Sequence, residues 1–109
     1  PARAMIDDGC AVALATDFNP GSCPILAMPL ILSIACSQMR LTPAEALVGA
    51  TLNAAWALGR QEVAGSLAPG KRADFVVLDG DDYRLIPYRA AHNPAAGVFV
   101  GGQEIMLNL

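Results

Sequence analysis

The chain has 109 residues, which is enough for one domain with a modest core. Apolar residues make up 54% and charged residues only 16%, so we expect apolar faces that a second copy or the rest of a larger protein must cover. A net charge of −3 with seven scattered basic residues excludes a basic patch, and with it nucleic acid and anionic membranes as expected partners.

The longest apolar run, residues 25–36, is interrupted by Pro29 and Ser33 and is shorter than the roughly 20 residues that cross a bilayer. We therefore expect no transmembrane span. The sequence also lacks an initiating Met and the pattern of a signal peptide. The three cysteines form no C-x-x-C pair, so we expect reduced thiols in a cytoplasmic protein rather than a zinc cluster.

The first elements predicted are a helix end and a strand. Residues 1–8 have apolar side chains at helical spacing before Gly9, which is typical of a helix end, and suggest that the protein continues upstream. Residues 11–15 are all small or branched and apolar, and predict a strand buried on both faces. Asp17 follows this strand at the end where α/β proteins bind ligands. It is either a catalytic or metal-binding carboxylate or a cap for the turn or the next helix.

Helices are predicted for the middle of the chain. A turn at residues 19–21 precedes a helix that contains Pro29 in its first turn. Thr42 and Glu45 then have the spacing of a capping box at the start of a second helix. The apolar spacing predicts that this helix continues to Leu58 and ends at Gly59, with Asn53 available for a contact to a loop.

From residue 65 the pattern changes to that of a small β unit. We expect a strand at residues 75–78, another at residues 83–86 and a helical turn at residues 87–91. Residues 97–100 and 103–106 predict a hairpin, because the Gly-Gly pair between them supplies the positive φ angles of a two-residue turn. These strands are too few to close a core alone.

Two passages resemble the amidohydrolase superfamily. They are Thr-Asp-Phe-Asn-Pro-Gly-Ser at residues 16–22 and Gly-x-Leu-x-x-Gly-Lys-x-Ala-Asp-x-Val at residues 65–76, supported by residues 39–47 and 53–59. The resemblance implies an α/β fold: the terminal part of a metal-dependent (β/α)8 barrel and part of a small accessory β-sandwich. Residues 1–62 would be the last βα units of the barrel, and residues 63–109 the carboxyl-terminal portion of the accessory domain.

The first passage is most similar to one branch of the superfamily. Enzymes of that branch hydrolyse the cyclic amide of 4-imidazolone-5-propanoate to N-formimidoyl-L-glutamate in histidine degradation. The resemblance implies that Asp17 binds one divalent ion, zinc or iron, and relays a proton from the attacking water. It further implies that Asn19 and Gly21 hold the propionate end of the substrate or the product, and that Ser22 contacts the imidazolone ring. The intact enzyme is expected to be a cytoplasmic homodimer that acts on a small molecule.

The histidine ligands and the general-base glutamate of that branch have no counterpart in this sequence. The chain alone is therefore expected to be an inactive carboxyl-terminal fragment. The alternatives are another amidohydrolase, such as a cyclic-amide hydrolase or a nucleobase deaminase, or a non-catalytic piece that associates with a partner chain.

Four further residues are not expected to take part in catalysis or metal binding. His92 is expected in a surface turn, while Lys71 and Asp74 serve the turn and the strand edge. Cys23 is not expected to be a nucleophile, because no histidine base follows at a plausible distance.

Overall fold

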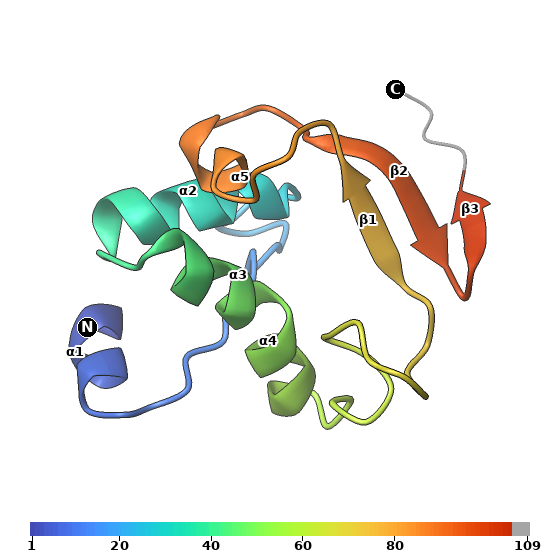
Figure 1. The fold of residues 1–109 in the computed structure, drawn as a ribbon. Helices are drawn as coiled ribbons and strands as arrows, with labels where there is room; N and C mark the ends of the chain where they lie inside the picture. Colours follow the sequence, from blue (N-terminus) through green and yellow to red (C-terminus); the bar gives the residue numbers. More distant parts are fainter. Residues whose placement is uncertain (106–109) are drawn as a thin grey trace.

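A computed structural model describes residues 1–105 of the chain. Helices occupy one side of the molecule and a three-stranded sheet the other (Figure 1). In chain order, the elements are α1 (Ala2–Asp7), α2 (Met28–Gln38), α3 (Pro43–Ala50), α4 (Leu52–Ala57), β1 (Phe75–Leu78), α5 (Leu85–Tyr88), β2 (Ala95–Val100) and β3 (Gln103–Ile105). Within the described part of the chain, no helix has the length and hydropathy that a membrane span requires.

The predicted helix end is confirmed as α1, but the predicted buried strand at residues 11–15 is wrong. The segment has no strand beside it among residues 1–105, and Leu14 is its one buried residue. A strand requires a neighbour with which to exchange backbone hydrogen bonds. Here the Leu14 N–H instead donates to the Gly49 carbonyl of α3 at 2.9 Å.

The helices of the middle region follow their local signals, with one interruption. Pro29 lies in the first turn of α2, and the capping box of α3 is present, with the side chains of Thr42 and Glu45 bonding each other's backbone N–H. The single helix predicted to Leu58 is instead two helices, separated at Thr51, where φ is −122° and ψ is −84°. The Thr51 hydroxyl donates to the Leu47 carbonyl at 2.7 Å, a side-chain bond that competes with regular helical pairing.

The sheet is antiparallel with strand order β1-β2-β3. The predicted strand at residues 75–78 is confirmed as β1, and the Phe75 ring stacks on Phe99 of β2 with ring centroids 4.6 Å apart. The hairpin is confirmed as far as Ile105, with positive φ at Gly101 and Gly102. Met106, which was predicted to continue the strand, lies outside the described residues.

The strand predicted at residues 83–86 is wrong, because most of this segment lies in or beside α5. The Asp82 carboxylate accepts the Arg84 N–H at 2.9 Å and starts a helical turn, as a short acidic side chain readily does. The helix then packs on α2, where the buried Ser33 hydroxyl donates to the Pro87 carbonyl at 2.8 Å. The helical turn predicted at residues 87–91 thus starts two residues earlier and ends at Tyr88.

A small core joins α1, α2 and α3. Its buried members are Ala2, Leu14, Leu32, Ala35, Leu41 and Ala46. Outside this core, large apolar side chains are exposed: Trp56 of α4 is 61% exposed, and the adjacent Val76 and Val77 of β1 are 51% and 46% exposed. Since successive strand residues point to opposite faces, each face of β1 carries an exposed valine and is only partly covered within residues 1–105. The uncovered apolar faces expected from the composition are therefore present.

Candidate active-site loop

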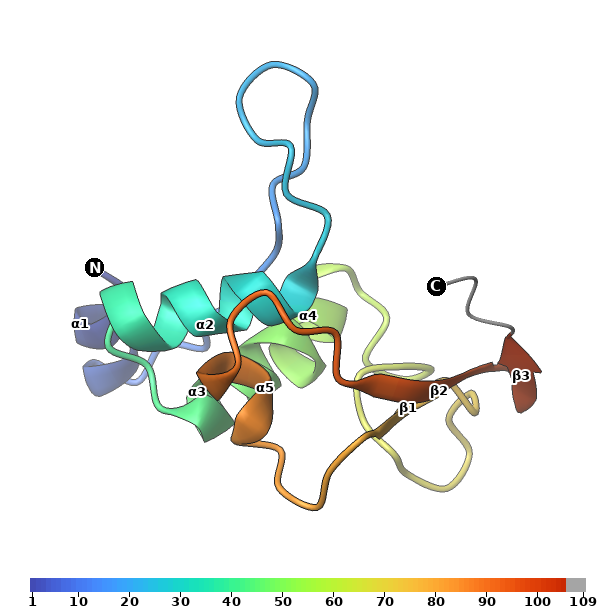
Figure 2. The same ribbon diagram turned by 90° about the horizontal axis from the view of Figure 1, so that it is seen from above.

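The loop of residues 16–23 projects away from the helices and the sheet (Figure 2). Its base is closed by two hydrogen bonds. The Asn19 N–H donates to the Cys23 carbonyl at 2.9 Å, and the Cys23 thiol donates to the Thr16 carbonyl at 3.1 Å. Between these contacts the tip is open, and the Phe18 side chain is 54% exposed. The loop is thus a defined turn that presents its tip to solvent.

Asn19 organises the tip of the loop. Its Oδ1 accepts the Gly21 N–H at 2.9 Å, the Ser22 N–H at 2.8 Å and the Ser22 hydroxyl at 3.2 Å. Its Nδ2 donates to the Asp17 carbonyl at 2.8 Å. Three donors therefore converge on one oxygen, and the structure brings Asn19, Gly21 and Ser22 together around it.

Asp17 lies beside this cluster with an unpaired carboxylate. Within residues 1–105, neither an N–H nor a basic side chain contacts the Asp17 carboxylate, and Asn19 Nδ2 bonds only the Asp17 backbone carbonyl. Its φ is +54°, in the left-handed region that Asp tolerates better than most residues. The structure does not support the alternative that Asp17 caps the turn, since Asn19 fills that role. An exposed, unpaired carboxylate can bind a cation or accept a proton.

The donor chemistry of Asp17 fits one ligand of a divalent metal ion and no more. Among the described residues there is no group of three or more His, Cys, Asp or Glu side chains that could hold a metal. A stable zinc site needs about three or four protein ligands. Asp17 would therefore have to share the ion with side chains that residues 1–105 do not supply.

The other residues weighed from the sequence have structural contacts. His92 is exposed in the turn after α5, as predicted, with its Nε2 3.2 Å from Asp79 Oδ2. Lys71 Nζ donates to the Ser66 hydroxyl at 2.8 Å within a turn. Asp74 accepts the Gly101 N–H at 2.7 Å at the hairpin. The predicted roles of these residues in turns and at a strand edge are confirmed.

Two residues hold the base of the loop. The sequence offers Asn53 for a contact to a loop without naming its partner, and it gives no such role to Gly49. Asn53 Nδ2 of α4 donates to the Val12 carbonyl at 3.0 Å, and Gly49 accepts the Leu14 N–H. A Cβ at Gly49 would lie 3.1 Å from both the Leu14 side chain and the Val12 carbonyl oxygen. The signal in the sequence is that Gly49 and Asn53 lie one helical turn apart among alanines. This pattern indicates a close contact but does not specify its partner.

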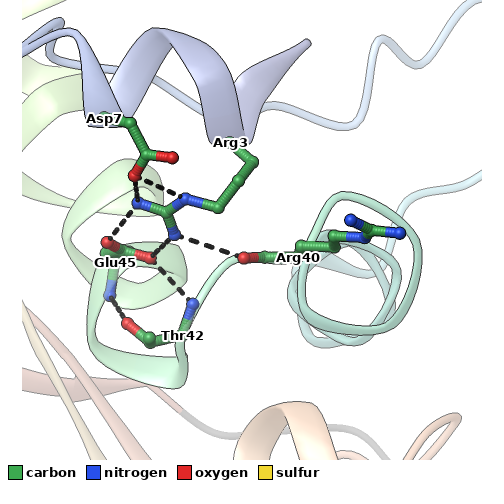
Figure 3. Close-up of polar contacts among 5 residues, drawn as sticks. All are labelled: Arg3, Asp7, Arg40, Thr42 and Glu45. Carbon is green, nitrogen blue, oxygen red and sulfur yellow. Dashed lines mark hydrogen bonds and ion pairs between the residues drawn. The ribbon is translucent and has the colours of Figure 1, made fainter.

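A charge cluster fixes α1 against α3, the helix that also binds Leu14 (Figure 3). The Arg3 guanidinium donates to both carboxylate oxygens of Glu45, at 2.7 and 3.0 Å, and to Asp7 at 2.9 Å. The hydrogen bond from Arg3, and then that from the Thr42 N–H, lowers the pKa of Glu45 to about 2. Glu45 therefore stays ionised and serves both helices at once.

Residues 1–105 match the model of the amidohydrolase family. The chain is 50% identical over 107 residues to an imidazolonepropionase of Chloroflexus aggregans, covering 98% of this chain and 25% of that protein. It is also 50% identical over 105 residues to an imidazolonepropionase of Geobacillus thermodenitrificans, covering 96% of this chain and 25% of that protein. The chain thus spans about a quarter of the length of these relatives.

Two solved structures are similar to the described fold. The amidohydrolase from Thermotoga maritima MSB8 has a TM-score of 0.71 and 26% identity, covering 95% of this chain and 25% of that chain. Guanine deaminase from E. coli has a TM-score of 0.77, covering all of this chain and 30% of that chain; at 21% identity this likeness concerns the fold alone. Together with the family match over residues 1–105, the comparisons show that the chain belongs to the amidohydrolase family.

Proposed function

We propose that the chain is the carboxyl-terminal part of an imidazolonepropionase. The intact enzyme would hydrolyse the cyclic amide of 4-imidazolone-5-propanoate to N-formimidoyl-L-glutamate in histidine degradation. The observation that carries this proposal is the loop of residues 16–23, which presents an unpaired carboxylate beside three convergent donors. The 50% identity to imidazolonepropionases over nearly the whole chain supports the choice of substrate.

In this proposal Asp17 holds the metal and moves a proton. Asp17 would be one ligand of a divalent ion, zinc or iron, which when bound would lower the pKa of the attacking water toward about 7. The Asp17 carboxylate accepts a proton from the water that attacks the ring carbonyl and returns it to the ring nitrogen as the carbon–nitrogen bond breaks. Its lack of other hydrogen-bond partners within residues 1–105 leaves both oxygens available for this work.

The donors around Asn19 Oδ1 are proposed to bind the acidic end of the substrate. A carboxylate oxygen has the same acceptor chemistry as the amide oxygen that the Gly21 and Ser22 N–H groups now contact at 2.9 and 2.8 Å. If the Asn19 side chain turns its Nδ2 toward the substrate, the Gly21 N–H becomes free for the propionate. The Ser22 hydroxyl then contacts the imidazolone ring.

The exposed apolar surfaces fit a piece of a larger assembly. We propose that residues 1–62 complete a (β/α)8 barrel and that residues 63–109 complete an accessory β-sandwich. In a complete barrel, residues 11–15 would gain the neighbouring strands that they lack here. The chain alone would be inactive, because Asp17 is a single ligand. By the same resemblance, the intact enzyme would be a cytoplasmic homodimer.

A chimera tests the proposal directly. This chain replaces the matching quarter of the Chloroflexus aggregans relative, and the loss of imidazolone absorbance is followed with zinc or iron present. We expect turnover in the chimera and none after Asp17→Asn. The matched control is Asp81→Asn, which changes an exposed carboxylate in the loop before α5 and should leave the rate unchanged. A near-parental rate for Asp17→Asn would remove this residue from the mechanism.

The same chimera separates the alternatives. Release of ammonia from guanine, with no loss of imidazolone absorbance, would favour a nucleobase deaminase. A chimera that folds and binds metal but turns over neither substrate would favour a non-catalytic piece that associates with a partner chain.

A further inference from the structure

The segment that leads into the active-site loop is held by two hydrogen bonds from the helices. Asn53 Nδ2 of α4 donates to the Val12 carbonyl at 3.0 Å, and the Leu14 N–H donates to the Gly49 carbonyl at 2.9 Å. The two bonds hold Val12 and Leu14, which are two residues apart in an extended segment. They fix the direction of this segment and its position relative to α3 and α4. Asp17 follows three residues after Leu14.

The helix break at Thr51 makes these two bonds possible. The last carbonyl groups of a helix have no partner within the helix, and Gly49 lies in the last turn of α3. Its carbonyl is therefore available to Leu14. Since α4 starts anew at Leu52, the half-buried Asn53 lies in its first turn and reaches the Val12 carbonyl.

The fit at this contact is tight. Gly49 is buried, and the space that a Cβ would need there is filled by Leu14 and the Val12 carbonyl at 3.1 Å. The Leu14 side chain is itself buried in the core formed by α1, α2 and α3. The base of the loop therefore has little room to shift while Asn53 keeps its bond.

We propose that Asn53 is a positioning residue for the reaction, acting through the main chain of residues 12–16 on the Asp17 carboxylate. This inference rests on the proposed function, because it assigns to Asn53 the placement of a proposed metal ligand. Outer partners that orient a metal ligand typically change metal affinity or activity about 10–100-fold when they are removed. An asparagine in the first turn of a helix on another element would thus set the geometry of the site.

The test compares three variants in the chimera described above. Asn53→Ala removes the donor and keeps α4, since Ala has the higher helix propensity. Asn53→Asp keeps the shape of the side chain but places an oxygen against the Val12 carbonyl, and serves if the alanine variant does not fold. The matched control is Asn93→Ala, which removes another side-chain bond to the backbone, that to the Ala95 N–H at 3.1 Å beside β2.

Three measurements are made on each variant. In the metal-free protein, hydrogen exchange of peptides from residues 11–23 should become faster for the Asn53 variants and not for Asn93→Ala. With Co²⁺ added as the probe, the visible absorption bands should shift in the Asn53 variants alone, because they report the arrangement of the ligands. The kcat should fall about 10–100-fold for the Asn53 variants.

The results distinguish failure of this inference from failure of the proposed function. Unchanged exchange and an unchanged Co²⁺ spectrum in a folded Asn53 variant would overturn the positioning role, even if the chimera is active. A fall in kcat that only matches a smaller folded fraction, with an unchanged spectrum, would also overturn it. A parental chimera with neither turnover nor a Co²⁺ spectrum would overturn the proposed function instead.

Discussion

Gly65 packs closely against α4, and its substitution gives a quantitative test of this contact. Its φ is +91°, and a Cβ there would lie 2.6 Å from Ala55 Cβ and 3.0 Å from the Thr51 carbonyl oxygen. A left-handed conformation costs an L-residue about 1–2 kcal/mol, and an extra carbon in a filled space costs about 1–3 kcal/mol. We therefore expect Gly65→Ala to lower the free energy of unfolding by about 2–5 kcal/mol.

Gly70 is the matched control. Its φ is +87°, but a Cβ there would meet nothing within 4 Å. Gly70→Ala should therefore cost only the conformational part, about 1–2 kcal/mol. Both variants are compared with the parent chain by urea denaturation followed by circular dichroism. Equal losses would show that Gly65 does not pack closely on α4, and would refute the reasoning.

Two further predictions concern the start of α3. Because its pKa is about 2 in the folded chain against an ordinary 4.5, Glu45 stabilises the fold fully above pH 4.5, and this contribution is lost as the pH falls toward 2. Urea midpoints measured across this range should fall less for Glu45→Gln than for the parent. The pKa of Asp82 is also lowered to about 2, so Asp82→Asn should remove part of the remaining pH dependence. An unchanged pH dependence in both variants would contradict the ion-pair geometry. Thr42→Ala removes the N-cap and should cost about 0.5–2 kcal/mol in the same assay, whereas Thr51→Ala should be nearly neutral because its hydroxyl competes with helical pairing. A larger effect at Thr51 would show that the helix break is itself stabilising.

Elements whose cause is local could be predicted from the sequence. The capping box needs only Thr42 and Glu45 at the right spacing, and the hairpin turn needs only two glycines. Residues 11–15 could not be predicted in the same way, since pairing depends on strands that lie elsewhere in a fold. Residues 83–86 are mostly apolar, as a short strand can be, but contact with α2 and the Asp82 turn favour α5.

In the candidate site, too, features with a local cause could be predicted and those that depend on distant contacts could not. That residues 16–22 form a turn around an Asn-Pro-Gly sequence follows from local chemistry. The sequence does not show that Asn19 bonds the turn and leaves the Asp17 carboxylate unpaired, because Asn and Asp can both cap a turn. The contact between Asn53 and Val12 spans 41 positions in the sequence, and no local pattern specifies its partner.

The shared carboxylate of Glu45 has a consequence for the order of assembly. The same oxygen, Oε2, accepts the Thr42 N–H at 2.8 Å and the Arg3 guanidinium at 2.7 Å. During synthesis, α1 therefore gains this ion pair only after a residue made more than forty codons later than Arg3 has emerged. Once that residue has emerged, one carboxylate both starts α3 and holds α1.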